Sequence, residues 1–404
     1  MRILFLSQYA LPHLDGISSA VDGLSRELAR RGHEVVHVAS DAGLEEAAEQ
    51  GGAVAASAGA GAPRVVHVPA TNFLENLLEV PYPLFSPQLL AVLRREIAAA
   101  DVVHGHGFLF MSSVGGLWWA RLRQACGRRA PLRVLTEHVG HVPYSNPILD
   151  LFEAATVASV GRLCALSSEA IVTLNDRVSG EMAAIAPGRP ALRIPNGIDV
   201  DRYRPPEPGE REALRGRLGW DARPRVLFVG RLVAKKGLDV ALAAAAAAEG
   251  AFELVVVGPG RPGPLPPEAS YLGPMPKERV AELYRAADAF LLPSRAEGFP
   301  VTVQEAMASG LPAVVSGDES YAPYRDGAGE GLTLVAPQAT AITAVLRGLF
   351  SSPTVLAAAG EAARAHAVGS FSWPRAAQEH ERLYEELRSQ KGFVQPSRPS
   401  RPAR

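Results

Sequence analysis

Cysteine, lysine and long apolar runs are scarce in this chain of 404 residues. The two cysteines, Cys126 and Cys164, exclude a disulfide scaffold and a cysteine zinc site, and they fit a reducing, cytoplasmic compartment. No apolar run reaches about 18 residues, so no transmembrane helix is expected, and the apolar start is too short for a signal peptide. The formal net charge of −1 provides no overall field that would attract nucleic acid or an anionic membrane.

The length of the chain favours two domains, because one hydrophobic core rarely grows to this size. Short β-branched segments such as RILFLS (2–7) and RVLFVG (225–230) alternate with amphipathic, helix-like segments in both halves. This alternation predicts an α/β fold made of two doubly wound, Rossmann-like domains that face each other across a deep cleft. Ligands in such sheets bind beyond the carboxyl ends of the strands.

Composition sets the expected boundaries. The segment from about 195 to 224 is rich in proline, glycine and charge and marks the junction between a domain over 1–195 and a domain over 196–370. Residues 41–62 are small and low in complexity and are interpreted as a surface insertion. The arginine-, serine- and proline-rich end, 391–404, is expected to be a disordered tail.

The stretch VLFVGRLVAKKGLDVAL contains two of the four lysines in the chain. A strand ends at Gly230, Arg231 follows it, and Lys236 precedes a helix. A cation at a strand end and a lysine near a helix N-terminus favour an anion such as phosphate. The alternative is a solvated basic loop, which the scarcity of lysine elsewhere makes less attractive.

The stretch SRAEGFPVTVQEAMASG places Glu297 and Glu305 eight residues apart around a turn and a helix N-terminus. The free amides of the helix start favour an anion, and Thr302 can add a hydroxyl. The two carboxylates are poor partners for phosphate but accept hydrogen bonds from sugar hydroxyls. The spacing therefore suits a nucleotide sugar, with two surface glutamates as the alternative.

In the first half, Gly16 follows a strand and precedes a helix, where a glycine lets phosphate approach, although no GxGxxG motif is present. His104 and His106 end one strand, and His138 and His141 follow another. Structural histidines are the simpler interpretation, because no carboxylate or cysteine completes a metal-ligand spacing. No metal or other cofactor is expected.

Two further motifs are interpreted as having a structural rather than a functional role. The DVD sequence at 199–201 looks like a metal motif but lies in the interdomain loop, so it is interpreted as a turn or helix cap. The WWARLRQACGRR stretch (118–129) joins two tryptophans to several arginines. A buried helix with a solvated basic edge is the preferred interpretation, and a surface that faces a membrane or an acceptor is the alternative.

Together these motifs resemble the retaining glycosyltransferases of family four, which have the GT-B fold. The resemblance extends from residue 1 to about 390 and is most specific in the second domain. It is carried by PNGID (195–199), GRLVAKKG (230–237), LPSRAEGFPVTVQEAMASGLPAVVS (292–316) and FSW (371–373), with weaker support from the DG turn at 15–16, HGH at 104–106 and TEH at 136–138.

The resemblance implies roles on the donor side of the cleft. Arg231 and Lys236 would neutralise the donor diphosphate and the leaving nucleotide, as a metal ion does in other enzymes. Glu297 would hold the hydroxyls of the donor sugar. Glu305 would bind the ribose. Met275, within YLGPMPKE, would help to frame the base.

The resemblance also implies that Gly298 and Phe299 line the sugar and phosphate, whereas Pro300 has no amide proton to donate. In the first domain, Gly16 would approach the diphosphate and His106 would lie near the transferred sugar. A helix over about 371–390 would return to the first domain.

The expected activity is retaining, metal-independent transfer of a hexose from a UDP- or GDP-sugar to a hydroxyl acceptor. Such an enzyme would work in the cytoplasm, free or peripherally at the inner face of the membrane. The alternatives are a nucleotide-sugar epimerase or a phosphorylase on the same fold, or a non-catalytic nucleotide-sugar-binding protein. The sequence leaves open the base, the sugar and the acceptor.

Overall fold

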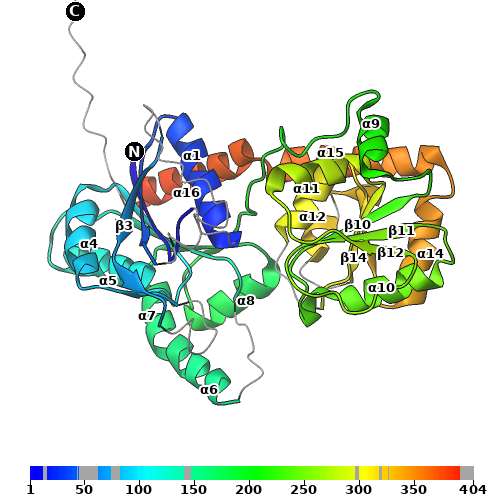
Figure 1. Cartoon of the computed structure of the whole chain (residues 1–404). Coiled ribbons are helices and arrows are strands. Elements are labelled where there is room, and N and C mark those ends of the chain that lie inside the picture. Colours follow the sequence, from blue (N-terminus) through cyan, green and yellow to red (C-terminus); the bar gives the residue numbers. More distant parts are fainter. Residues whose placement is uncertain are drawn as a thin grey trace, which may run out of the picture.

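The computed structural model describes residues 1–11, 16–42, 44, 62–73, 82–140, 147–295, 300–317, 321–325 and 327–391. Most of the segment 41–62 and nearly all of the expected tail therefore lie outside the described residues. The chain forms two α/β units, each built on a parallel sheet (Figure 1). The prediction of two doubly wound domains is confirmed.

The first sheet has seven parallel strands in the order β3-β2-β1-β6-β7-β8-β9. They are β3 (Arg64–Val68), β2 (Glu34–Ser40), β1 (Arg2–Leu6), β6 (Val102–His106), β7 (Leu132–Glu137), β8 (Ala170–Thr173) and β9 (Ala191–Arg193). The helices that accompany them are α1 (Gly16–Arg30), α4 (Gln88–Ala99), α5 (Met111–Ala125), α6 (Pro147–Thr156), α7 (Arg162–Ser167) and α8 (Asp176–Ile185). A π-helical turn, η1 (Val157–Gly161), joins α6 to α7, and β4 (Ala70–Thr71) pairs with β5 (Leu84–Phe85).

The second sheet has six parallel strands in the order β12-β11-β10-β13-β14-β15. They are β12 (Ala269–Tyr271), β11 (Glu253–Val257), β10 (Arg225–Val229), β13 (Ala289–Leu292), β14 (Ala313–Ser316) and β15 (Leu332–Val335). The accompanying helices and turns are α9 (Glu210–Leu218), η2 (Ala234–Lys236), α10 (Leu238–Ala247), α11 (Lys277–Ala286), α12 (Val301–Ala308), α13 (Ala322–Arg325), η4 (Gly329–Gly331), α14 (Ala339–Leu349) and α15 (Pro353–Phe371). The last described helix, α16 (Trp373–Gln390), packs on the first domain.

Both faces of the central strands of the first sheet are buried, which explains why β1 is apolar along most of its length. On β1, Ile3 and Phe5 belong to the core on one face, and Leu4 and Leu6 to the core on the other. The core on the Phe5 side includes residues of α1 and also Tyr384 of α16, the last described helix. The end of the chain therefore completes the first domain.

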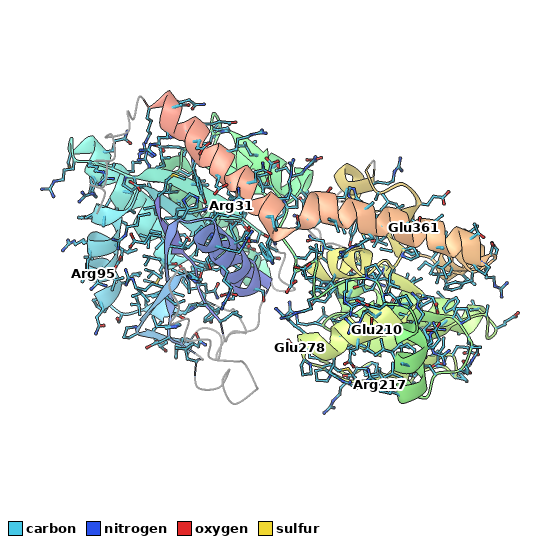
Figure 2. The ribbon with its side chains drawn as sticks, turned by 90° about the horizontal axis from the view of Figure 1, so that it is seen from above. Arg31, Arg95, Glu210, Arg217, Glu278 and Glu361 are labelled. Carbon is cyan, nitrogen blue, oxygen red and sulfur yellow. The ribbon has the colours of Figure 1, made fainter. Side chains whose placement is uncertain are left out.

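The helices α15 and α16 extend along one side of the molecule, α15 over the second domain and α16 over the first (Figures 1 and 2). Arg31, labelled in Figure 2, donates hydrogen bonds from the end of α1 to Glu381 of α16, at 2.6 and 3.0 Å. Among the described helices, none alone is long and apolar enough to cross a bilayer. In the part of the chain that the structure describes, one pair of helices, α14 and α15, passes that test together, and the pair is bent by 103°.

Candidate active site

The basic loop lies at the carboxyl end of β10. The strand ends at Val229, the turn η2 closes at Lys236, and α10 begins immediately after Gly237. Gly237 has a left-handed backbone (φ +72°), and a Cβ there would collide with the carbonyl of Pro293. The stem of Lys236 lies over Gly230, so the loop folds back across the end of its own strand.

Arg295 joins this loop to the neighbouring strand, β13. Its guanidinium donates to the carbonyl of Ala234 at 2.6 Å and to the carboxylate of Asp239 at 2.5 Å, while its amide donates to the carbonyl of Lys235 at 2.7 Å. Because β10 and β13 pair directly, both motifs lie at one edge of the sheet. Glu297, Gly298 and Phe299 follow this anchor but lie outside the described residues.

The helix α12 positions the second carboxylate. Glu305 is buried, with its carboxylate 3.2 Å from the hydroxyl of Tyr284 and hydrogen-bonded to that of Tyr203. Burial raises the pKa of Glu305 to about 7, and the two tyrosine hydroxyls and the nearby Lys277 oppose that rise. In the first turn, the buried hydroxyl of Thr302 has no hydrogen-bond partner among the described residues.

In the first domain, four buried histidines gather where β6 and β7 end and α16 crosses. His106 lies with Nδ1 3.1 Å from Nε2 of His138, and His104 hydrogen-bonds to the hydroxyl of Tyr384 at 2.7 Å. Burial lowers the pKa of His138 and of His380 to about 4 and that of His106 well below its usual value. These rings are therefore neutral at physiological pH.

His106 also faces a small pocket enclosed by the first domain, the start of the interdomain loop and α16. The pocket is bordered by His138, by Asn196 of the interdomain loop and by Trp373 and His380 of α16. Nε2 of His106 is buried and has no hydrogen-bond partner among the described residues. The side chain can therefore donate or accept one more hydrogen bond, as a sugar contact requires.

The predicted site residues thus fall into two groups. Arg231, Lys236, Thr302 and Glu305 surround the carboxyl ends of β10 and β13, and Met275 packs half-buried against the core of the same domain. Gly16 and His106 belong to the first domain.

One hydrogen bond links the two domains close to both groups of predicted site residues. The ammonium of Lys277, at the start of α11, donates to the hydroxyl of Ser19 in α1 at 3.1 Å. Gly16 begins α1, and Met275 lies two residues before Lys277. Figure 2 shows Glu278, the residue after Lys277, on the side of the second domain that faces the first. A Cβ on Gly16 would meet no atom of the described residues within 4 Å, so the surrounding fold itself does not require glycine there.

Comparison with known proteins identifies the family. A family model described as "Glycosyl transferases group 1" matches residues 210–366, and one described as "Glycosyltransferase Family 4" matches residues 14–202. A GDP-mannose-dependent alpha-mannosyltransferase of Mycobacterium tuberculosis is 31% identical over 327 residues, which cover 78% of each chain. The chain belongs to this family of glycosyltransferases.

Other relatives of this glycosyltransferase agree in sequence and fold. A D-inositol 3-phosphate glycosyltransferase of Rhodococcus opacus is 31% identical over 309 residues, covering 70% of this chain and 67% of the relative. Sucrose-phosphate synthase of Thermosynechococcus elongatus superposes with a TM-score of 0.74 at 19% identity, covering 96% and 99% of the two chains. The Anabaena protein HepE in complex with UDP gives 0.71 at 17% identity, covering 96% and 100%. These structures establish the GT-B fold.

Of the two motifs interpreted as structural, the DVD sequence (199–201) of this glycosyltransferase forms the predicted turn, whereas the stretch 118–129 differs from its prediction. The carboxylate of Asp199 accepts hydrogen bonds from the amides of Asp201 and Arg202, at 3.2 and 3.0 Å, which is the predicted turn. In the described part of the chain no group of three or more His, Cys, Asp or Glu side chains is placed to hold a metal ion. On α5, however, Trp118 lies on the solvent side, contrary to the prediction of a helix buried apart from its basic edge.

Several residues that support the predicted ones are not identifiable from the sequence alone. Tyr203 and Tyr284 flank Glu305, and His380 joins the histidine group from the far end of the chain. The helical period places Tyr284 on the buried side of α11 and His380 on that of α16. That signal predicts burial, but it does not identify the partners. Glu305 is 21 residues from Tyr284, and His104 is 276 residues from His380.

Proposed function

We propose that this glycosyltransferase transfers a hexose from a UDP- or GDP-sugar to a hydroxyl of its acceptor, with retention of anomeric configuration and without a metal ion. The proposal is based on the basic loop after β10 and the helix α12 after β13, which follow paired strands at one edge of the sheet. Arg295 ties the end of β13 to the basic loop. The names of the relatives support a nucleotide-sugar donor, because one is GDP-mannose-dependent and another was crystallised with UDP.

In the proposed arrangement, Arg231 and Lys236 neutralise the diphosphate and stabilise the charge that develops on the leaving nucleotide. The hydroxyl of Thr302 and the amides at the start of α12 add hydrogen bonds to the phosphates. Glu305 accepts hydrogen bonds from the ribose, Glu297 from the sugar, and Met275 lies against the base. Gly298 and Phe299 line the sugar.

The first domain contributes from the opposite side. The absence of a side chain at Gly16 lets the backbone approach the diphosphate, and neutral His106 offers Nε2 to a sugar hydroxyl. The acceptor hydroxyl then attacks on the face from which the phosphate departs, and that phosphate accepts the proton. We propose a cytoplasmic location, in agreement with the two cysteines, which are both free.

The test compares Lys236→Ala with Lys235→Ala. The side chain of Lys235 is exposed and is assigned no role, so the second variant is a matched control for loss of one positive charge. Nucleotide release is measured with UDP-glucose or GDP-mannose and with D-inositol 3-phosphate as one candidate acceptor. We expect Lys236→Ala and Glu297→Ala to lower kcat by about 10²-fold or more, since each removes transition-state stabilisation.

Thermal unfolding shows that the variants remain folded, and the anomeric configuration of the product is read by NMR. Wild-type turnover in Lys236→Ala would contradict the proposal. Conversion of the donor sugar without nucleotide release indicates an epimerase, and a requirement for inorganic phosphate indicates a phosphorylase. Donor binding without nucleotide release across a panel of hydroxyl acceptors indicates a non-catalytic binding protein.

A further inference from the structure

The helical segment that follows β7 presents an apolar face to solvent. Leu151 and Phe152 of α6 are 72% and 70% exposed, and Val160 of η1 and Leu163 of α7 are also exposed. The exposed residues between them are mostly alanines. Large apolar side chains rarely gather on the surface of a monomeric protein without a partner.

This face continues onto α5, which packs beside α7. Trp118, which is 44% exposed, and Leu122 lie on the outer side of α5. The guanidinium of Arg121 bridges the two helices by donating to the carbonyl of Leu166 at 2.9 Å. Trp118, Leu122, Leu151, Phe152, Val160 and Leu163 together form what we call the α6 patch.

Arginines predominate on the α5 side of the α6 patch. No acidic residue occurs between Asp101 and Glu137, a stretch that includes Arg121, Arg123 and Arg128. Arg162 is exposed within the patch itself. The two acids of α6, Asp150 and Glu153, are only half-exposed, and helical geometry places them opposite the exposed apolar face.

We infer that the α6 patch docks this protein on the surface of an anionic lipid bilayer. An apolar helical face with a basic surround inserts its side chains at the boundary between headgroups and acyl chains, while the arginines contact lipid phosphates. A second copy of the chain is a poorer occupant, because a two-fold contact would bring Arg162 and the α5 arginines against their own counterparts.

The position of the patch agrees with this docking. Figure 1 shows α6 and α7 on the side of the first domain opposite α1 and α16, with α6 extending outward from the domain. A planar surface can therefore meet α6 without displacing the helices that connect the two domains. The patch is also assigned no part in the proposed donor site, so docking and transfer can be tested separately.

The test is co-sedimentation of the full chain with vesicles of phosphatidylcholine alone or mixed with phosphatidylglycerol, without nucleotide sugar. We expect binding to the anionic vesicles, little binding to phosphatidylcholine alone, and weaker binding in high salt. The double variant Leu151→Gln, Phe152→Gln should weaken binding by about tenfold or more, because these two side chains are the most exposed. Glutamine is used because it favours helix as leucine does.

The matched control is Val355→Gln, Val368→Gln, which replaces two exposed apolar residues of α15 and should leave vesicle binding unchanged. Thermal unfolding verifies that both double variants are folded. The inference is overturned if the wild-type chain binds neither vesicle, or if the α6 variant binds as well as the control. It is also overturned if the wild-type chain is a dimer that the α6 substitutions dissociate, because a second copy would then occupy the patch.

Discussion

At the scale of single residues, Glu305 has the environment that most affects function. Its carboxylate is buried with Tyr203 and Tyr284, and the pKa of about 7 places its titration near neutrality. A carboxyl group with a raised pKa is protonated below that value, so its capacity as a double acceptor for ribose hydroxyls grows as the pH rises through 7.

We therefore expect donor affinity to rise with pH. Binding of GDP-mannose or UDP-glucose, measured by calorimetry, should be about tenfold weaker near pH 6 than near pH 8, as expected for one carboxyl group with this pKa. The diphosphate is esterified at both ends and does not titrate in this range. Glu305→Gln should bind more weakly and lose the pH dependence. A wild-type affinity that is flat across the range would contradict the assigned role.

At the scale of elements, the loop between β10 and α10 depends on one backbone conformation. Gly237 combines a left-handed backbone with contact against the carbonyl of Pro293, so a side chain would strain the backbone and also displace the neighbouring strand end. The loop holds Lys236 and contacts Arg295, so this conformation joins the two donor motifs.

Backbone strain alone typically costs about 1–3 kcal/mol. We expect Gly237→Ala to lower the free energy of unfolding by more than this amount and to abolish turnover. Gly250→Ala is the control, because Gly250 has a left-handed backbone (φ +83°) but no described atom within 4 Å of a Cβ. Chemical denaturation measures both free energies of unfolding. Equal losses in the two variants would show that the contact with Pro293 has no structural importance.

The elements themselves were largely predictable from the sequence. The apolar strand RVLFV and the glycine before α10 are local signals, and both appear as expected in β10 and at Gly237. The partners of Glu305 were not predictable, because Tyr203 and Tyr284 reach it only through the packing of α11 and the interdomain loop. The predicted burial of Trp118 is wrong for a similar reason, since the helical period alone does not indicate which face the sheet covers.

At the scale of the whole molecule, the chain crosses between the domains twice, and the crossings support each other. The amide of Ile198 donates to the carbonyl of Phe371 at 2.6 Å. Trp373 packs against both Gly197 and Gly23, where any Cβ would collide with its ring. The resemblance implies that a last helix returns to the first domain. The contacts that hold this helix in place are visible only in the three-dimensional structure. They join the interdomain loop to the start of α16 and to α1.

We propose that the carboxyl edge of the second sheet binds a nucleotide-sugar diphosphate without a metal ion. The most direct test is a thermal-shift panel of UDP-, GDP- and ADP-sugars, each with and without a chelator, on the wild-type chain, Lys236→Ala and Lys235→Ala. A ligand that binds only the folded state raises the melting temperature. We expect UDP- or GDP-sugars to stabilise the wild-type chain and Lys235→Ala but not Lys236→Ala, and the chelator to leave this stabilisation unchanged. No shift with any donor, or a shift abolished by the chelator, would contradict this proposal.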